Sequence, residues 1–286
     1  MPRYAVTGST GHLGPLVIAG MLRLGIAPND IVAVARTPAK AAALTEVGLQ
    51  VRYGDYSKPE TLPGALDGVG RLLLISGSEV GNRVAEHTSV VDAAVAAGVG
   101  HVVYTSVLRA DSTQLAIAPE HKATERVIRQ SNVPFTFLRN SFYTENYTAQ
   151  IPSYLASGAI VGAAGGALIS AAPRADYAAA CVTALTQDSH RNAVYELGGP
   201  PFTMDDVAEA VWRATGTHLE YRNVSPGELR DILIAAGMDE NHAAFVVRIE
   251  EGIARGDVYT ESHDLARLIR REPTPLAAVI AAAARA

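Results

Sequence analysis

The chain has 286 residues, enough to bury one large core or a main core with a smaller annex, and its net charge of −5 gives no reason to expect a nucleic acid partner. The single cysteine, Cys181, excludes an internal disulfide framework and fits a reducing compartment, so we expect a cytoplasmic protein. No secretory signal precedes the first glycines and no apolar run reaches about 18 residues, so we expect no membrane partner.

Apolar runs of strand length recur along the first half of the chain, separated by stretches with helical periodicity. The runs are not clean alternations of apolar and polar residues, which is typical of strands covered on both faces. Strand and helix in this alternation predict an α/β fold with a parallel, doubly wound sheet. The predicted strands are residues 3–6, 31–35, 49–53, 72–75, 101–105 and 135–138.

Local signals mark where helices begin and end between these strands. Thr37-Pro38 predicts an N-cap and first turn, and Gly48 and Gly98 follow the ends of two helical stretches. These signals support the alternating order of strands and helices.

The alternation of strand and helix signals ends near residue 150. We therefore divide the chain into a dinucleotide-binding domain, 1–150, and a mainly helical substrate-binding region, 151–286. Residues 158–170 read as a short hairpin around Gly165-Gly166, and residues 193–199 as a strand that returns to the main sheet. The other signals are a helix at 173–187, helix starts at 203–206, 225–228 and 274–275, and helix ends at Gly216 and Gly237.

A glycine-rich turn follows the first strand in "YAVTGSTGHLG" and precedes a helix. Such a turn lets backbone amides and the positive end of the helix approach a pyrophosphate. We predict that Gly8 makes the turn, Gly11 permits the closest approach, and Gly14 lets the helix pack against the strand. The spacing is GxxGxxG, and the strand before it and the helix after it favour dinucleotide binding over a simple tight turn.

The end of the second strand discriminates between the two pyridine dinucleotides. An acidic residue there would bind the 2′-hydroxyl of NAD, but this chain has Arg36, followed by Lys40. A guanidinium pairs with a 2′-phosphate and a carboxylate repels it, so we predict NADP(H). The alternative is that Arg36 is a solvated surface charge.

Two further strand ends carry candidate cofactor residues. Asp55 closes the third strand, where it could meet an adenine amino group or cap the segment that begins at Ser57. Ser76 and Gly77 follow the fourth strand, where the middle of the cofactor is expected to cross. The eight histidines show no metal-ligand spacing and GxSxG and GxxxxGKS/T are absent, so we expect no metal, serine hydrolase or P-loop NTPase.

Taken together, several stretches resemble the NmrA-like atypical short-chain dehydrogenases, and within them the NADPH-dependent quinone reductases and dye reductases. The resemblance runs from the first strand to about residue 180 and continues more loosely to the last helix. The stretches are "TGSTGHLG", "VARTPAKA", "VRYGDY", "LLLISGSEVGNR", "HVVYTS", "PEHKATE", "FTFLRNSFYTENY" and "PRADYAAA".

The resemblance implies a Rossmann-type fold with NADPH lying across the strand ends. It places the phosphates on Gly8, Thr10, Gly11, His12 and Leu13, the 2′-phosphate on Arg36, and the adenine beside Asp55 and Tyr56. It lines the middle of the cofactor with Ser76, Gly77 and Ser78 and brings Arg83 to the phosphates or a ribose. It places Tyr104, Thr105 and Ser106 under the nicotinamide ribose. It turns Asn140, Ser141, Phe142 and Tyr143 toward the nicotinamide and the substrate, although Phe142 and Tyr143 could be plain core.

The chain lacks the acid of the ordinary short-chain dehydrogenases, because none of its 11 tyrosines has a lysine four residues on. Reduction of a simple ketone needs such an acid, since the product alkoxide is a strong base. A quinone escapes the requirement, because hydride transfer leaves a phenolate-like anion whose conjugate acid titrates near the tyrosine value of about 10. We therefore predict an NADPH-dependent reductase of a quinone or a related conjugated aromatic.

The chain needs only to orient the acceptor and offer hydrogen bonds to the developing oxyanion. The candidates for hydrogen bonding are Tyr104, Asn140, Tyr143 and Lys122, and those for an aromatic wall are Phe142, Tyr143 and Tyr147. His121 is either a proton donor or a residue that fixes its helix against a neighbouring loop. Glu125 could simply pair with Arg129 one turn later.

Two other functions stay open. One is a tailoring reductase of a polycyclic aromatic, polyketide-like metabolite. The other is a regulator of the NmrA type that senses NADP without catalysis. The sequence leaves the oligomeric state open, with a homodimer as one option.

Overall fold

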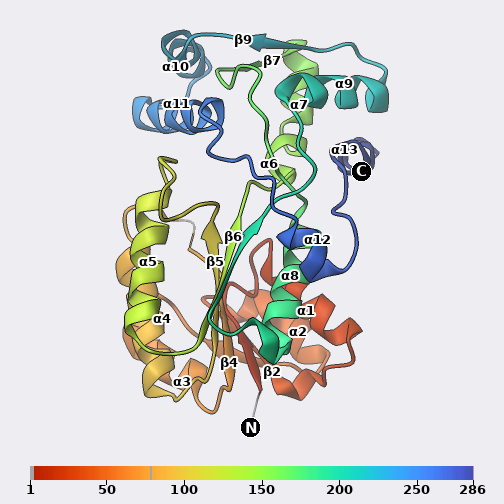
Figure 1. Ribbon diagram of the computed structural model, residues 1–286. Helices are drawn as coiled ribbons and strands as arrows, with labels where there is room; N and C mark the ends of the chain where they lie inside the picture. Colours follow the sequence, from red (N-terminus) through yellow and green to blue (C-terminus); the bar gives the residue numbers. More distant parts are fainter. Residues whose placement is uncertain (1–2, 78, 286) are drawn as a thin grey trace.

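The computed structural model describes residues 3–77 and 79–285, and its centre is a seven-stranded sheet whose neighbouring strands all run parallel (Figure 1). The strand order is β3-β2-β1-β4-β5-β6-β8. This order confirms the predicted doubly wound sheet, and the strand expected at 193–199 forms at its edge. The strands are β1 (Tyr4–Val6), β2 (Ile31–Ala35), β3 (Gln50–Tyr53), β4 (Arg71–Leu74), β5 (Val102–Val107), β6 (Phe135–Asn140) and β8 (Ala193–Leu197).

Successive residues of the central strands enter different cores on the two faces of the sheet. Tyr4 and Val6 belong to one cluster of buried residues and Ala5 to the other. On β5, Val103 belongs to the first cluster and Tyr104 to the second. Burial on both faces explains why the strands read as continuous apolar runs in the sequence.

Helices cover both faces of the sheet, as Figure 1 shows. The first face packs against α1 (Gly14–Arg23), α8 (Arg174–Thr186) and α12 (Asp264–Ile269), with α8 lying between the other two. The second face packs against α3 (Leu62–Leu66), α4 (Arg83–Ala96) and α5 (Ala118–Gln130). The short α2 (Ala42–Glu46) follows β2.

A second lobe stands over the carboxyl edge of the sheet and has its own core, which includes Ile160, Val211 and Ile253. The chain passes between the sheet and this lobe five times, after β6, before α8, after β8, before α12 and after α12. The lobe contains α6 (Glu145–Thr148), α7 (Ile151–Ser157), β7 (Ala159–Gly162), α9 (Met204–Thr215), β9 (Glu220–Asn223), α10 (Pro226–Ala235), α11 (Glu240–Ala254) and α13 (Leu276–Ala283).

The hairpin predicted around Gly165-Gly166 is wrong. Gly165 does turn the chain, at φ +59°, but the segment after it does not return along β7. Instead β7 pairs in parallel with β9, and Ile169 pairs with Phe202. β7 and the segment around Ile169 both bury side chains in the second core. Pairing with β9 and with Phe202 brings more apolar residues into that core than a local hairpin would.

Most of the predicted helix ends are confirmed. Thr203 caps α9 in a capping box with Asp206, the Ser225 side chain caps α10, and Gly216 ends α9 at φ +77°. Thr37 stands before a short 3₁₀ turn, but its side chain makes no capping hydrogen bond. Among the described residues, no helix is both long and apolar enough to cross a membrane.

Candidate active site

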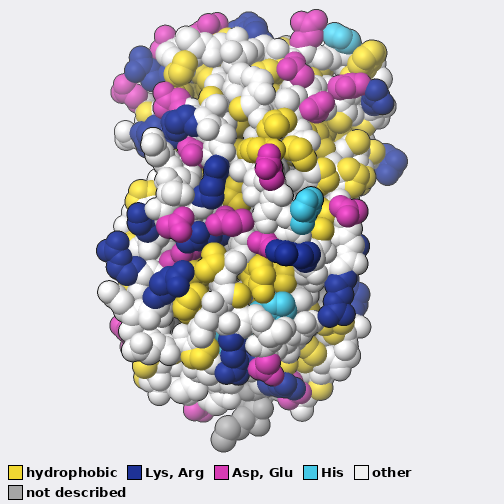
Figure 2. Space-filling view, in the orientation of Figure 1, with side chains coloured by type: hydrophobic (Ala, Val, Ile, Leu, Met, Phe, Trp, Pro, Cys, Tyr) yellow, Lys and Arg dark blue, Asp and Glu magenta, His cyan; other side chains and the backbone are white. Residues whose placement is uncertain are grey.

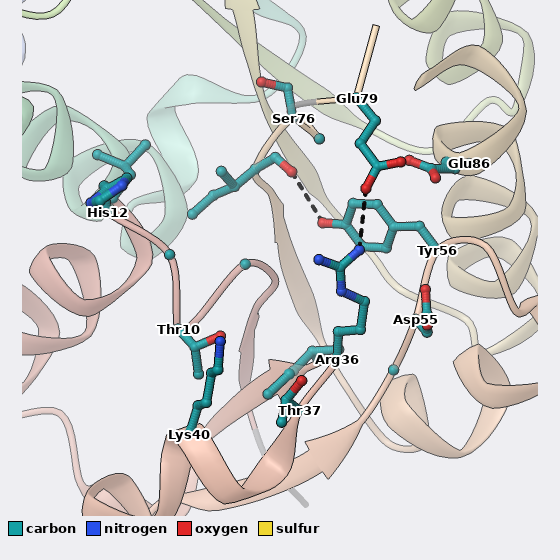
Figure 3. A pocket seen from close by; sticks show the side chains of 18 of the residues that line it. Thr10, His12, Arg36, Thr37, Lys40, Asp55, Tyr56, Ser76, Glu79 and Glu86 are labelled. Carbon is teal, nitrogen blue, oxygen red and sulfur yellow. Dashed lines mark hydrogen bonds and ion pairs between the residues drawn. The ribbon is translucent and has the colours of Figure 1, made fainter. Parts of the chain in front are cut away.

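A hollow of about 550 Å³ opens at the carboxyl ends of β1, β2, β3 and β4. This edge is where parallel sheets of this type bind nucleotides, beside the strand at which the order reverses. Figure 3 shows the labelled side chains around it. The lining residues are Gly8, Thr10, Gly11, His12, Leu13, Val34, Ala35, Arg36, Thr37, Lys40, Gly54, Asp55, Tyr56, Ile75, Ser76, Gly77, Glu79, Glu86, Tyr143 and Arg174.

The glycine loop forms the floor of the hollow, and its geometry requires glycine at two positions. Gly8 has φ +59°, and a Cβ at Gly14 would lie 2.4 Å from the Gly8 carbonyl oxygen. Gly14 therefore lets α1 begin against the loop itself, rather than against the strand as predicted. The Ser9 hydroxyl turns inward and donates to the Val34 carbonyl at 2.9 Å, which ties the loop to β2.

The first turn of α1 presents unused backbone donors at the loop. Leu13, which precedes the helix, makes no side-chain capping bond, and the first turn contains no acidic residue. Within the described residues, the N–H groups of His12 and Leu13 have no acceptor. Free N–H groups and the positive end of the helix macrodipole suit a phosphate.

Two cations point into the hollow from the β2 side. Figure 3 places Lys40 beside Thr10. Arg36 lies between this pair and the carboxylates of Glu79 and Glu86. Arg36 lies 3.4 Å from Glu79, but the two side chains are 70% and 56% exposed, so this ion pair is weak and leaves Arg36 available to an anion. Burial and the Glu79 charge raise the pKa of Glu86.

At the end of β3, Asp55 forms a local turn with Ser57, but the helical turn that follows begins only at Pro59 and has Lys58 at its N-cap position. The Asp55 Oδ1 accepts from the Ser57 N–H at 3.1 Å and the Ser57 hydroxyl at 2.8 Å. It also lines the hollow, and its contact with adenine stays a prediction. The neighbouring Tyr56 hydroxyl donates to the Ile75 carbonyl at 3.0 Å and joins the ends of β3 and β4.

The segment after β4 lines the hollow as expected with Ser76 and Gly77, and Ser78 lies outside the described residues. Arg83 differs from the prediction, because its side chain is buried and does not line the hollow. Its Nε donates to the Gly77 carbonyl at 2.8 Å and its Nη1 to Glu120 at 2.9 Å. The partner carboxylate comes from α5, which the sequence near Arg83 could not indicate.

The three β5 residues predicted beneath the nicotinamide ribose do not line the hollow. The Tyr104 hydroxyl pairs with His121 Nδ1 of α5 at 2.8 Å, and the Ser106 hydroxyl donates to Glu125 at 2.7 Å. Thr105 stays one step away, since its Oγ1 accepts from the Ser76 N–H at 2.9 Å. The structure differs from the prediction because α5 covers the face of β5 that carries Tyr104 and Ser106, and its side chains form hydrogen bonds with both hydroxyl groups.

Two predicted α5 residues, His121 and Lys122, also have partners away from the hollow. Burial lowers the pKa of His121 to about 3, so it stays neutral, and its bond to Tyr104 fixes α5 to a strand rather than to a loop. The Lys122 ammonium donates to the Asp111 carbonyl at 2.9 Å, so it faces the β5–α5 loop instead of an acceptor.

The predicted pairing of Glu125 with Arg129 is wrong. Glu125 accepts from the buried Arg139 at 2.7 and 2.9 Å, because β6 passes directly beneath this turn of α5. The Arg129 guanidinium instead lies 4.6 Å from the centre of the Phe135 ring.

Asn140 ends β6 with a buried amide whose nitrogen and oxygen have no hydrogen-bond partner among the described residues. The next residue, Ser141, differs from its prediction, because its hydroxyl donates to the Val258 carbonyl at 2.7 Å. Phe142 is half-buried against the core of the second lobe. A buried amide without partners is costly in a folded protein and indicates a ligand contact.

Two tyrosines follow, and only one lines the hollow. Tyr143 does so, under the Arg174 guanidinium, which lies 4.7 Å from its ring centre, and burial raises its pKa to about 12. Tyr147 is buried in the second lobe, edge-on to Phe202 at 5.6 Å between ring centres. Its hydroxyl has no partner in the described part of the chain, and its place in a substrate wall remains a prediction.

A second hollow of about 520 Å³ adjoins the first, because His12 and Arg174 line both. Glu145, the first residue of α6, accepts at 2.9 Å from the N–H of Arg174, the first residue of α8. The structure therefore gives one end of the main hollow a polar extension beneath the second lobe, lined further by Asn146, Thr148, Ala149 and Gln150.

Sequence reasoning missed several lining residues. Arg174 carried one signal, since a basic residue in the first turn of a helix opposes the macrodipole and calls for another role. Glu79 and Glu86 carried none, because nothing local shows that the segment after β4 folds over the hollow. No cluster of three or more His, Cys, Asp or Glu able to hold a metal occurs within residues 3–77 and 79–285.

The doubly wound sheet, the glycine loop at the first helix and the cations after β2 define a Rossmann-type dinucleotide-binding protein. The NmrA-like family model matches residues 3–261, and the chain belongs to that family.

The protein is similar over nearly its whole length to characterised relatives. It is 40% identical over 274 residues to quinone oxidoreductase 2 of Escherichia coli, covering 96% of each chain. The crystal structure of an E. coli NADPH-dependent quinone oxidoreductase with NADPH superposes with a TM-score of 0.95, at 39% identity, over 98% of this chain and 99% of that one. The triphenylmethane reductase of Citrobacter sp. with NADP(H) gives a TM-score of 0.93, at 37% identity, over 98% and 100%.

Proposed function

We propose that this protein is an NADPH-dependent oxidoreductase that transfers a hydride to a quinone or a related conjugated aromatic acceptor. One observation carries the proposal. A single hollow extends from Arg36 and Lys40, past the glycine loop, to Tyr143. That order of groups matches a dinucleotide with an extra phosphate at one end and a redox ring at the other. The similarity to a quinone oxidoreductase and a triphenylmethane reductase, both solved with NADP(H) or NADPH, supports it.

The residues present fit NADPH. The N–H groups of His12 and Leu13 suit the diphosphate, and Arg36 and Lys40 suit the 2′-phosphate. The residue that ends β2 is followed directly by Arg36 and not by a carboxylate, which would favour NAD. We infer that the sheet and residues 1–150 hold the cofactor, and that the second lobe forms the acceptor side.

When bound, NADPH supplies the hydride, and the residues of this chain position the acceptor and shield it from water. The Arg174 guanidinium holds the Tyr143 ring in place as a flat wall where the two hollows meet. The unpartnered Asn140 amide offers a donor to an acceptor oxygen or to the carboxamide of the nicotinamide.

No protein acid is required for this reaction. The reduced quinone leaves as a phenolate-like anion with a conjugate acid that titrates near 10, so water can protonate it. This agrees with the structure, in which His121 is neutral and Lys122 faces a loop. A simple ketone, which does need an acid, should not be reduced at a comparable rate.

The direct test is to mix purified protein with NADPH and a panel of quinones and to follow the loss of absorbance of the reduced nicotinamide. We expect turnover with quinones, a strong preference for NADPH over NADH, and no turnover with simple ketones. Binding of NADPH without turnover on any acceptor would contradict the proposal and favour an NADP-sensing regulator.

A further inference from the structure

The wall of the main hollow after β4 contains a glycine that is held on both sides by buried side chains of α4. The Gly77 N–H donates to Nε2 of His87 at 3.0 Å, and the Gly77 carbonyl accepts from Nε of Arg83 at 2.8 Å. These two groups belong to the peptide units before and after the Gly77 Cα. Since glycine has the widest backbone freedom of any residue, the two bonds fix dihedral angles that its own sterics leave open.

The bonds at the two ring nitrogens of His87 together fix which nitrogen carries its proton. Because Nε2 accepts from Gly77, the proton must be on Nδ1, which lies 3.0 Å from the Thr124 hydroxyl. The Thr124 hydroxyl in turn donates to the Glu120 carbonyl at 2.9 Å, so it is free to accept from His87. The hydrogen bonds therefore run in one direction from the hollow through α4 to α5.

The surroundings keep His87 in the neutral form that this arrangement needs. The ring is fully buried, and burial together with the Arg83 charge lowers its pKa to about 3. The rings of Tyr56 and Tyr104 face it edge-on from the sheet, at 6.0 and 5.5 Å between ring centres. His121 of α5 is its other titratable neighbour and is also neutral.

A carboxylate of α5 secures the other half of the same arrangement. Glu120 pairs with Arg83 at 2.9 Å and accepts from the Gly81 N–H at 2.9 Å. Glu120 and Thr124 lie one helical turn apart, so both present to α4 from the same face of α5. The N–H and carbonyl of Gly77 both form hydrogen bonds with side chains of α4. A cofactor can therefore approach the Gly77 backbone closely without meeting an unpaired donor or acceptor on that residue.

We propose that His87 and Thr124 are positioning residues for the dinucleotide: Thr124 sets the tautomer of His87, and His87 holds the Gly77 peptide in the orientation that the cofactor wall requires. Neither side chain lines the hollow. The proposal rests on NADPH binding in this hollow, as proposed above. It adds that hydrogen bonds from α5 through His87 fix the conformation of the hollow's wall at Gly77 before the cofactor binds.

The test measures the dissociation constant for NADPH by calorimetry, together with kcat at saturating NADPH. His87→Leu removes the acceptor and should weaken NADPH binding by about tenfold, which is typical of losing one buried hydrogen bond, with kcat changed less than about twofold. Thr124→Val should weaken it by about threefold to tenfold, and Thr124→Ser, which keeps the hydroxyl, should restore it. His87→Gln, which keeps an acceptor near Nε2, should restore part of the affinity.

A matched control is Thr88→Val on α4, because its hydroxyl donates only to the Val84 carbonyl one turn earlier. This variant loses the same kind of intrahelical bond that Thr124→Val loses, so it should bind NADPH as the unaltered protein does. Equal effects of the two valine substitutions would overturn the proposal.

Nitrogen chemical shifts of histidine-labelled protein provide a readout that needs no variant. We expect the His87 ring to carry its proton on Nδ1 at pH 7, and a proton on Nε2 would overturn the proposal even if His87→Leu failed to fold. Unchanged NADPH affinity in folded His87→Leu would overturn it as well. Failure of the unaltered protein to bind NADPH would instead refute the proposed function, so the two failures are distinguishable.

Discussion

Arg36 carries the choice of cofactor through its charge. Arg36→Glu should lower kcat/KM for NADPH by about 100-fold, because it removes a charge-assisted contact to the 2′-phosphate and adds repulsion. The value for NADH should fall much less or rise, since a carboxylate at this place suits a free ribose hydroxyl. Steady-state kinetics with both cofactors test this, and an unchanged ratio would mean that Arg36 does not bind the phosphate.

We expect the unpartnered Asn140 amide to contribute to turnover and to lower the free energy of unfolding. Asn140→Leu replaces two unsatisfied buried polar atoms with apolar ones of similar volume, so the free energy of unfolding should stay the same or rise by up to about 1 kcal/mol. Turnover should fall by about tenfold or more. Urea unfolding and steady-state kinetics measure the two effects.

The neighbouring Ser141→Ala serves as the comparison, because the Ser141 hydroxyl is satisfied by the Val258 carbonyl. It should lose about 1 kcal/mol of stability. If Asn140→Leu were the less stable of the two variants, an unobserved partner would have to satisfy the Asn140 amide.

At the scale of elements, the contact between the glycine loop and α1 depends on a missing side chain. In Gly14→Ala the added Cβ would lie 2.4 Å from the Gly8 carbonyl oxygen and 2.8 Å from the Ser9 Cα, and these backbone atoms cannot rotate away. We expect a loss of about 2 kcal/mol in the free energy of unfolding and weaker NADPH binding.

Gly64→Ala is the matched control, because Gly64 lies in α3 with no atom within 4 Å of the added Cβ. It should stabilise the protein by about 0.5–1 kcal/mol, since alanine loses less backbone entropy in a helix. Chemical denaturation of both variants checks the pair. Similar stability of Gly14→Ala and Gly64→Ala would contradict the close approach.

The strands and the cofactor loop could be predicted because their signals are local. Continuous apolar runs followed by helical periodicity indicate a sheet buried on both faces. Gly8 and Arg36 follow strand ends that the pattern itself locates, and Gly14 begins the helix after the first strand. The roles of Arg83 and Tyr104 could not be predicted, because their partners belong to α5 and depend on how α4 and α5 pack. The hairpin predicted around Gly165-Gly166 was wrong for the same reason, since β9, the partner of β7, lies far along the chain.

Across the whole molecule, three buried histidines should make the protein sensitive to acid. Burial lowers the pKa of His87 and His121 to about 3 and that of His101 to about 4, whereas all three titrate near 6.5 in the unfolded chain. The unfolded state therefore binds more protons below pH 6.5. The stability that comes from keeping these rings neutral is complete above that pH, and it is lost as the pH falls toward 4.

Linkage turns these shifts into an expected loss of about 4 kcal/mol in the free energy of unfolding between pH 7 and 5.5. Urea unfolding across this range measures it, and calorimetry in buffers of different ionisation enthalpy counts the protons taken up on unfolding. A flat stability profile from pH 7 to 5.5 would show that these rings are accessible to protons in the folded state.

The five passages of the chain between the sheet and the second lobe bear on how the molecule can be divided. A fragment that ends at residue 150 would lack β8, α8 and α12, and would expose the apolar faces of α1 and β6 that they cover. Segments of the two lobes thus alternate along the sequence, although each lobe has its own core in space. Neither lobe is one contiguous stretch of sequence, so neither could be exchanged between relatives as a single segment.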